Sequence, residues 1–219
     1  MPWTGGHAMT HNPALLTPLQ TQALDVLFAD EWFRRYFYLT GGTALAAFYL
    51  FHRESDDLDF FCHQEDLTPI PALVSALGRK LDIPVEPVQT RPGFMRFTLG
   101  KGLKLDFVSD VDFRVGAPES RNDYRIDSLK NIAVNKVCAI LGRLDAKDYV
   151  DLYFILKEQA YDIFELLDWG RQKDKGLELF TWTTVIADVE TLSILPRMIK
   201  PVTLKELQIF YSGLRDLIL

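Results

Sequence analysis

The sequence has few cysteines and no long apolar segment. Its two cysteines among 219 residues, Cys62 and Cys138, lack the spacing of metal ligands. We expect both to be buried thiols in a reducing compartment. The longest fully apolar run, Ala44–Phe51, has eight residues, whereas a helix needs about 20 to cross a bilayer. The sequence therefore predicts a soluble cytoplasmic protein with no membrane partner.

The chain also lacks an excess of positive charge. Its net charge of −6 provides no global basic field to attract nucleic acid, although a local basic groove is compatible with that value. With 48% hydrophobic and 25% charged residues, the composition is typical of a globular protein. No internal repeat or low-complexity tract is present. The length allows one large domain or two small ones.

Apolar periodicity divides the chain into a mixed half and a helical half. In the first half, we predict helices at 16–35, 43–51 and 68–81, and strands at 37–39, 57–62, 84–89, 94–99 and 103–108. Residues 111–125 are polar and rich in turn formers, which indicates a connector. In the second half, helices are predicted at 127–141, 145–158, 161–173, 176–187 and 202–218. The expected class is α+β, with an α/β core at 13–125 and a helical domain at 126–219.

Two aspartates on a predicted strand are the first candidate functional residues. Asp57 and Asp59 are separated by one residue, so they point to the same face of the strand, while Leu58 and Phe60 point to the other. Two adjacent carboxylates repel each other unless a cation neutralises them. Their hard oxygen atoms suit Mg²⁺. The pair therefore predicts a magnesium site.

A third carboxylate is predicted on a later strand. In 103–108, Leu105 and Phe107 share one face with Leu103, and Asp106 shares the other face with Lys104. If this strand lies next to 57–62, Asp106 joins the aspartate pair as a metal ligand or general base. Three carboxylates can hold two Mg²⁺ ions roughly 3.5–4 Å apart, which is the arrangement for in-line phosphoryl or nucleotidyl transfer.

A glycine pair precedes the predicted helix at 43–51. Gly41 and Gly42 would allow the backbone to approach a phosphate closely, and the helix that follows would offer its N-terminus. Thr43 could add a hydroxyl group. Strand, glycine turn, helix and aspartate strand together predict a nucleotide site.

These residues resemble the signature of a known family. The sequences Gly-Gly-Thr-Ala-Leu at 41–45 and Arg-Glu-Ser-Asp-Asp-Leu-Asp-Phe at 53–60 closely resemble that of the AbiEii/AbiGii-type nucleotidyltransferase toxins, members of the DNA polymerase β-like nucleotidyltransferase superfamily. A second block of that family is similar to Lys136 followed by Lys-Asp-Tyr-Val-Asp-Leu at 147–152. The resemblance covers residues 37–156.

The resemblance implies a fold, a reaction and roles for particular residues. It implies a polymerase β-like core with a mixed sheet, joined to a helical C-terminal half. Asp57 and Asp59 would bind Mg²⁺, Lys136 would contact the nucleotide phosphates, and Asp148 or Asp151 would complete the site. The implied reaction transfers a nucleotide from a nucleoside triphosphate (NTP) to an acceptor, which in some members is the 3′ end of tRNA. Members of this family are usually paired with an antitoxin.

Several of these residues have structural alternatives. Arg53 could hold a phosphate or form an ion pair with the acidic cluster. Ser55 could bind a phosphate or cap the local backbone. Asp56 should point away from Asp57 and be solvated or paired with Arg53. His52 is assigned a structural role.

The second block has alternatives of the same kind. Lys136 could reach inward to a triphosphate or extend along the protein surface. Asp148 and Asp151 could instead form charge pairs along their helix.

The sequence therefore predicts a toxin-like, magnesium-dependent nucleotidyltransferase acting on an RNA or protein hydroxyl. One alternative is a non-catalytic protein of the same fold that binds a nucleotide or partner. Another is a small-molecule nucleotidyltransferase. The position of Asp106 discriminates the first alternative, because without it beside the aspartate pair the two-metal arrangement is incomplete.

Overall fold

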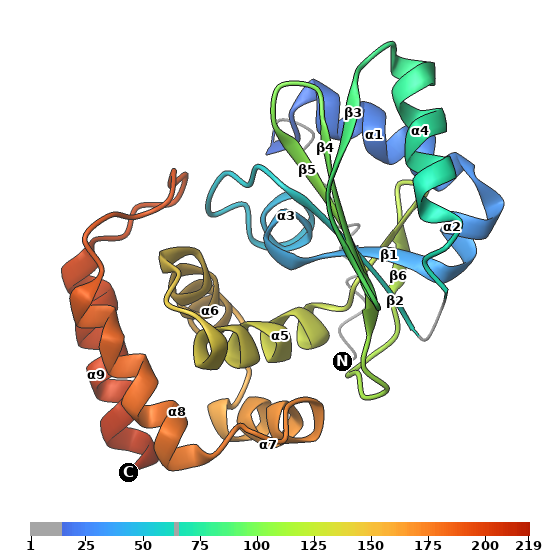
Figure 1. Ribbon diagram of the computed structural model, residues 1–219. Helices are drawn as coiled ribbons and strands as arrows, with labels where there is room; N and C mark the ends of the chain where they lie inside the picture. The colour runs from blue at the N-terminus through green and yellow to red at the C-terminus, as the bar shows by residue number, and fades with distance from the viewer. Residues whose placement is uncertain (1–14, 64–65) are drawn as a thin grey trace, which may run out of the picture.

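The computed structural model describes residues 15–63 and 66–219. In this part of the chain, a seven-stranded mixed sheet has the order β3-β4-β5-β2-β1-β7-β6 (Figure 1). The strands are β1 (Phe37–Thr40), β2 (Leu58–His63), β3 (Val85–Arg91), β4 (Phe94–Leu99), β5 (Leu103–Asp110), β6 (Glu119–Arg121) and β7 (Tyr124–Ile126). The helices are α1 (Pro18–Ala29), α2 (Glu31–Tyr36), α3 (Gly41–Leu45), α4 (Ile70–Leu81), α5 (Leu129–Gly142), α6 (Ala146–Glu158), α7 (Ile163–Lys173), α8 (Leu179–Ile186) and α9 (Leu204–Ile218). The predicted α+β class, with a helical C-terminal half, is confirmed.

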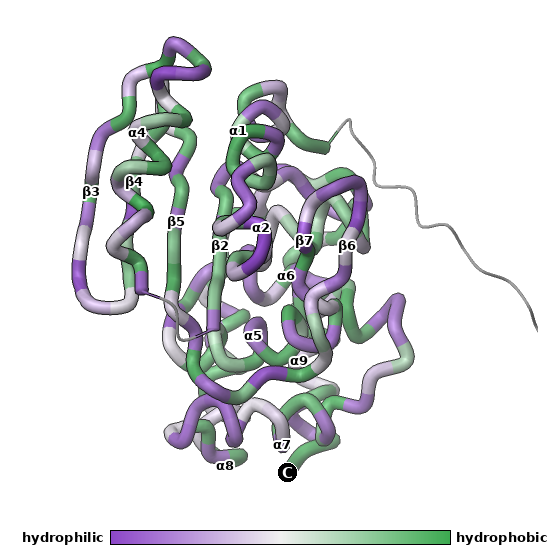
Figure 2. Tube along the Cα trace, turned by 90° about the vertical axis from the view of Figure 1, so that its right-hand side faces the viewer, coloured by the Kyte–Doolittle hydropathy of each residue, from purple (hydrophilic) through white to green (hydrophobic). Residues whose placement is uncertain are grey.

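The central strands alternate as their sequences predict. Leu58 and Phe60 on β2, and Leu105 and Phe107 on β5, are fully buried, and the rings of Phe60 and Phe107 stack with centroids 5.4 Å apart. Phe28 of α1 packs on this face against Phe60. In Figure 2 the edge strand β3 is more hydrophilic than β5. The apolar face of β2 and β5 therefore anchors the sheet, which leaves the opposite face for polar side chains.

Three local details differ from the prediction. The interpretation of 111–125 as a connector was wrong at its end, because β6 and β7 form a hairpin whose turn residues Asn122 and Asp123 both have positive φ. The helix predicted at 16–35 is divided at Asp30, whose carboxylate accepts a hydrogen bond from the Phe33 amide at 2.9 Å. The helix predicted at 43–51 begins at Gly41 and closes with a π-helical turn.

Buried hydrogen bonds join the helices of the C-terminal half to one another. Trp182 of α8 donates from Nε1 to the Val137 carbonyl of α5 at 3.0 Å, and the Tyr211 hydroxyl of α9 donates to the Tyr149 carbonyl of α6 at 2.7 Å. One cluster of buried apolar residues extends through the sheet and these helices, so the division at residue 125 stays a prediction. Among the described residues, none of the helices combines the length and the apolar composition that a membrane span requires.

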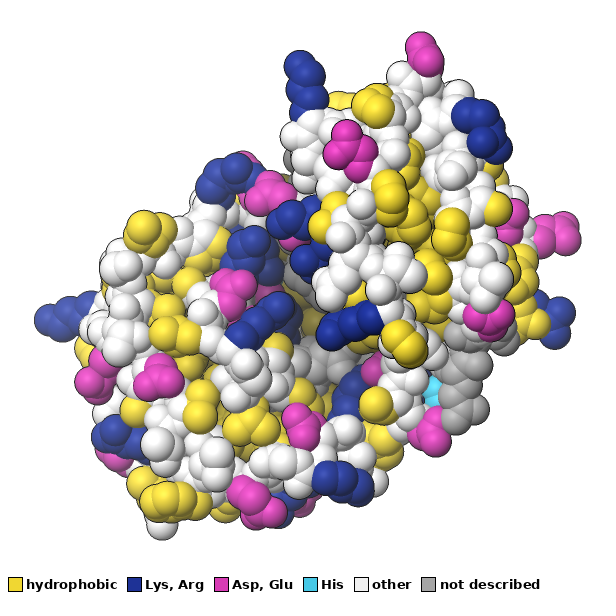
Figure 3. Space-filling model, viewed as in Figure 1, with side chains coloured by type: hydrophobic (Ala, Val, Ile, Leu, Met, Phe, Trp, Pro, Cys, Tyr) yellow, Lys and Arg dark blue, Asp and Glu magenta, His cyan; other side chains and the backbone are white. Residues whose placement is uncertain are grey.

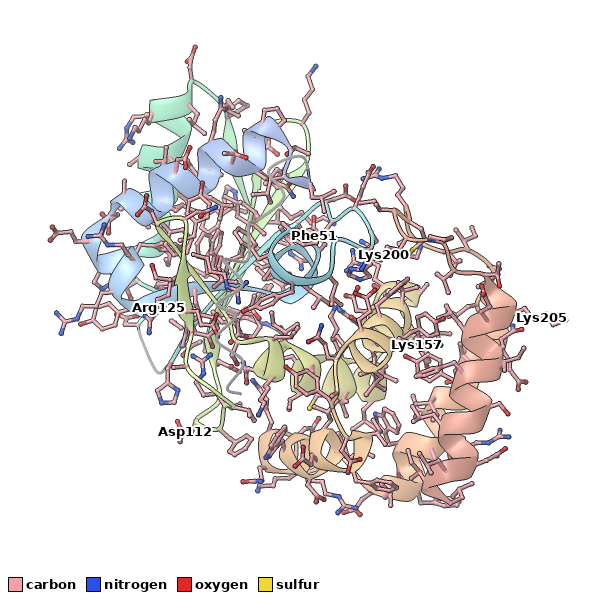
Figure 4. The ribbon with its side chains drawn as sticks, turned by 180° about the vertical axis from the view of Figure 1, so that it is seen from behind. Phe51, Asp112, Arg125, Lys157, Lys200 and Lys205 are labelled. Atoms are coloured by element: carbon pink, nitrogen blue, oxygen red, sulfur yellow. The ribbon has the colours of Figure 1, made fainter. Side chains whose placement is uncertain are left out.

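A segment between α8 and α9 reaches back to the loop before β2. The Ile199 and Lys200 amides donate to the His52 carbonyl at 2.9 and 3.0 Å, and Lys200 lies beside Phe51 in Figure 4. Arg197 pairs with Glu54 at 2.5 Å and also with the Asp56 carboxylate. Asp56 is therefore paired with Arg197 rather than with Arg53.

Candidate active site

A cavity of about 840 Å³ lies between the polar face of the sheet and the helical half. Figure 3 shows Lys and Arg side chains gathered around this hollow. The predicted site residues that line it are Gly41, Gly42, Arg53, Ser55, Asp57, Asp59, Asp106, Lys136 and Asp148. Thr43 and Asp151 are fully enclosed behind the lining. The structure therefore brings together residues from both sequence blocks.

The three candidate carboxylates meet at the cavity. Asp59 and Asp106 share one face of the sheet, whereas Asp57, predicted to lie on the strand, is in the loop immediately before β2. β2 and β5 are parallel neighbours, and their register aligns Asp59 with Asp106. Asp57 lies two residues before Asp59 and also lines the cavity, with its Oδ2 atom 3.9 Å from Lys104 Nζ. Burial, and then the negative charge of Asp106, raises the pKa of Asp59 from 3.8 to about 6. Because neighbouring carboxylates repel each other, this cluster would be stabilised by a bound cation.

Arg96 on β4 is a member of this site that the sequence analysis missed. Its Nε and Nη2 atoms donate to the two Asp106 carboxylate oxygens at 2.7 and 2.5 Å. Arg96 and Asp106 are register partners across β4 and β5, and the hydrogen bond to Asp106 raises the pKa of Arg96. Strand alternation through the hairpin of β4 and β5 is the signal that could have identified it.

The carboxylates of this site have the chemistry of magnesium ligands, but they are not arranged as a complete set of ligands around one ion. Within residues 15–63 and 66–219, no group of three or more His, Cys, Asp or Glu side chains is arranged to hold a metal ion. Asp57 and Asp59 offer hard oxygen ligands, whereas both oxygens of Asp106 are engaged by Arg96. The residues therefore fit magnesium through Asp57 and Asp59, whereas Asp106 is held by Arg96 in this structure.

The glycine pair is packed against charged groups of the site. Gly41 has φ +68°, and a Cβ atom there would lie 2.2 Å from Asp59 Oδ2. At Gly42 a Cβ atom would lie 2.4 Å from Arg53 Nη2. Both glycines thus allow α3 to begin directly against the side chains of Asp59 and Arg53.

Replacing Gly41 should damage the site more than the fold. In Gly41→Ala, the left-handed backbone costs about 1–2 kcal/mol of unfolding free energy. The new methyl group also displaces the Asp59 carboxylate, and we expect the activity of this site to fall about a hundredfold. Gly213→Ala is the control, because nothing lies within 4 Å of its Cβ position and the residue does not line the cavity. Equal activity in the two variants would contradict the role of Gly41.

Thr43 supports the aspartate loop from behind. Its hydroxyl donates to the Asp57 carbonyl oxygen, and the residue is 1% exposed. Ser55 lines the cavity, and its carbonyl accepts a hydrogen bond from the Gln20 side chain at 2.9 Å. The structure therefore directs the Thr43 hydroxyl to the backbone of Asp57 rather than into the cavity.

Asp151 is the centre of a buried ionic network beneath the cavity. Arg53 donates to it from Nε and Nη2 at 2.6 and 2.8 Å, His52 Nε2 lies at 2.7 Å, and Lys136 Nζ lies at 2.7 Å. Burial alone would raise the pKa of Asp151, but the charges of Lys136 and Arg53 outweigh it and hold that pKa well below 3.8. Of the two alternatives for Arg53, the structure favours the ion pair, with Asp151 as its partner.

Asp148 extends the network toward the cavity. It accepts from Lys136 Nζ at 2.7 Å and from Arg143 Nε at 2.7 Å. Lys136 is neither extended along the surface nor isolated: it is 6% exposed, paired with two carboxylates, and still borders the cavity. Its positive charge offsets part of the rise in the pKa of the nearby Asp59 that burial and Asp106 cause. The network thus places a fixed cation beside the three carboxylates.

The raised pKa of Asp59 gives a prediction for stability without metal. In the folded protein the pKa of Asp59 is about 6, whereas its ordinary value, taken for the unfolded chain, is 3.8. Ionised Asp59 therefore destabilises the folded state above pH 6. This penalty disappears as the pH falls below about 4. Asp59→Asn should therefore be about 2 kcal/mol more stable than the wild type at pH 8, allowing for partial exposure. Urea unfolding in EDTA at pH 8 and pH 4 measures this difference, and an Asn variant less stable than the wild type at pH 8 would contradict it.

Known proteins resemble this chain in sequence and in fold. The sequence model described as "Nucleotidyl transferase AbiEii toxin, Type IV TA system" matches residues 22–178. An uncharacterized protein of Aquifex aeolicus (strain VF5) is 33% identical over 147 residues, which cover 65% of this chain and 68% of that protein.

Two crystal structures from Helicobacter pylori share the fold. JHP933 has a TM-score of 0.59 and 22% identity, and the match covers 91% of this chain and 88% of that chain. A candidate nucleotidyltransferase has a TM-score of 0.61 and 21% identity, and the match covers 91% of both chains.

Proposed function

The chain belongs to the AbiEii family of nucleotidyltransferase toxins, and from this premise we propose that it transfers a nucleotide from an NTP to a hydroxyl group of RNA with the help of magnesium. The observation that carries the proposal is the alignment of Asp59 with Asp106 on the cavity face of the sheet. Asp57 and the N-terminus of α3 border the same cavity.

The proposed roles follow the positions of the side chains. Asp57 and Asp59 hold the metal, and Asp106 acts as third ligand or general base once Arg96 turns away. The backbone of Gly41 and Gly42, beside Ser55, contacts the NTP phosphates. Bound magnesium would neutralise charge on the attacking hydroxyl and on the leaving pyrophosphate.

The ionic network supports the site from the helical half. Lys136 borders the cavity and is oriented by Asp148 and Asp151, so we assign it the neutralisation of phosphate charge. Asp148 and Asp151 act through Lys136 and Arg53 rather than on the substrate. Thr43 acts through the backbone of Asp57.

An assay of three acceptor classes tests the proposal. The protein is incubated with magnesium and each NTP labelled at the α-phosphate, together with total RNA, with cell protein, or with an aminoglycoside. We expect the label to enter RNA with one preferred NTP. If the label enters protein or the aminoglycoside and RNA stays unlabelled, the proposal of an RNA acceptor is wrong and the labelled class is the acceptor.

The proposal extends to cellular partners. Assignment of the family to Type IV toxin–antitoxin systems supports an antitoxin partner. Among the described residues, Cys62 and Cys138 are thiols rather than members of a disulfide, which supports a cytoplasmic location.

A further inference from the structure

One of the three carboxylates of the site already has a cation bound to it. Arg96 on β4, Asp106 on β5 and Asp59 on β2 form a row across three neighbouring strands, because the register pairs Arg96 with Asp106 and Asp106 with Asp59. The Arg96 guanidinium binds both oxygens of Asp106, at 2.7 and 2.5 Å. A bidentate pair of arginine and carboxylate is strong and fixed in direction. Asp106 is therefore neutralised before any metal ion binds.

The other cations that act on Asp59 are bound to a different carboxylate. The charges of Lys136 and Arg143 offset part of the rise in the pKa of Asp59. Both cations, however, pair with Asp148, Lys136 through Nζ and Arg143 through Nε, each at 2.7 Å. The negative charge that a metal ion would compensate thus lies at the Asp59 end of the row rather than at Asp106.

The remaining acidic residues that line the cavity are engaged elsewhere. Asp110 pairs with Lys173 at 2.9 Å. Asp145 and Asp174 each accept a hydrogen bond from the backbone amide two residues further along the chain, at 2.9 and 2.8 Å. Because these three carboxylates serve an ion pair, a helix cap and a turn, a second ion beside the first would depend on Asp106.

Arg96 is the more exposed partner of its ion pair. The side chains of Arg96 and Asp106 are 36% and 10% exposed, so the guanidinium has room to turn while the carboxylate stays in place. Mg²⁺ sheds its waters reluctantly and is usually held by one or two carboxylates together with substrate phosphates. The ion alone is therefore a poor competitor for a carboxylate that an arginine already binds through both oxygens.

The phosphates of an NTP change this competition in two ways. They supply ligands to the ion, and they are bidentate partners for an arginine. Adjacent strands are about 4.8 Å apart, and the Arg96 side chain already spans the distance from β4 to Asp106 on β5. A phosphate held above Asp59 and Asp106 would thus lie next to the guanidinium.

We propose that Arg96 limits the NTP-free protein to one divalent ion, held by Asp57 and Asp59, and leaves Asp106 to a second ion only when the phosphates of an NTP bind. The inference rests on the proposed function, since these phosphates belong to the nucleotide donor. Arg96 makes metal loading depend on the substrate. The set of metal ligands is then complete only with an NTP in place.

Electron paramagnetic resonance of bound Mn²⁺ tests the role of Arg96 without any reaction. Two ions that share carboxylates lie about 3.5–4 Å apart, and their magnetic coupling gives a spectrum distinct from that of single ions. We expect one uncoupled ion per chain in the wild type, and a coupled pair after addition of an NTP analogue with a methylene group between its α- and β-phosphates. Arg96→Met, which offers Asp106 no hydrogen bond, should hold the coupled pair without the analogue.

Arg91→Met is the matched control. Arg91 lines the same cavity, but its guanidinium lies over the Phe94 ring, 4.7 Å from the centroid. Its loss removes one positive charge and leaves the Arg96 pair intact, so this variant should bind one uncoupled ion, as the wild type does. The double variant Arg96→Met/Asp106→Asn should also return to one ion, because the second ion has lost its ligand. Thermal unfolding verifies that each variant is folded.

The opposite results separate this inference from the proposed function. A coupled pair in the wild type without the analogue, or a single ion in Arg96→Met, would overturn the role of Arg96 and leave the proposed reaction intact. A single ion in the wild type with the analogue would overturn the release of Asp106 by NTP. If the wild type binds no Mn²⁺ under either condition, the proposed magnesium site is wrong, and the role of Arg96 falls with it.

Discussion

Asp59→Asn should lower nucleotide transfer at least about a thousandfold while the protein remains folded. The amide cannot supply the anionic oxygen that a magnesium site requires, and charge stabilisation of this kind is worth several kcal/mol, with each 1.36 kcal/mol equal to a factor of ten in rate. The nearly identical shape of Asn preserves the packing against Gly41. The measurement is the initial rate of α-label incorporation at saturating magnesium.

Asp56→Asn is the matched control for this loss. Its side chain is 59% exposed and pairs with Arg197 outside the cavity, so the transfer rate should stay within about twofold of the wild type, as for an exposed ion pair. Thermal unfolding verifies that both variants are folded. An Asp59→Asn rate above a tenth of the wild-type rate would contradict the assignment of Asp59 as a metal ligand.

Asp151→Ala should be strongly destabilising, with a loss of about 3–5 kcal/mol of unfolding free energy. The carboxylate is completely buried and holds Arg53, Lys136 and His52. Without this carboxylate, buried Arg53 loses its anionic partner and Lys136 keeps only Asp148. Urea unfolding at pH 7 measures the loss.

An exposed carboxylate provides the comparison for Asp151. Asp168 is 70% exposed and lies 3.5 Å from Arg171, so Asp168→Ala should change the unfolding free energy by no more than about 0.5 kcal/mol. A loss below about 1 kcal/mol in Asp151→Ala would show that the network does not hold the two halves of the site together.

Strand alternation made the carboxylate face predictable. A period of two residues is enough to place Asp59 on one face of β2 and Leu58 and Phe60 on the other. Asp57 lies one residue before β2 and reaches the same cavity from the loop. The apolar pattern around Asp106 likewise implied that its carboxylate faces away from the core. That the two strands are neighbours was a condition of the prediction. The structure meets it through a parallel pairing of β2 with β5 that puts Asp59 opposite Asp106.

Contacts between distant segments were beyond the reach of these patterns. Arg53 and Asp151 are 98 positions apart, and no local periodicity indicates which of the nearby acids an arginine will select. The ion pair of Arg197 with Asp56 is a similar case, because the two residues are 141 positions apart. The hairpin of β6 and β7 was missed because its strands have three residues each, too few to show an alternation.

Comparison of α-labelled and γ-labelled NTP tests the central claim most directly. The protein, RNA and magnesium are incubated with the preferred NTP carrying one label or the other, for the wild type and for Asp59→Asn. Nucleotidyl transfer at the three carboxylates predicts that wild-type protein places the α-label, and no γ-label, on RNA, and that Asp59→Asn places neither. Transfer of the γ-label, or equal α-labelling by Asp59→Asn, would contradict it.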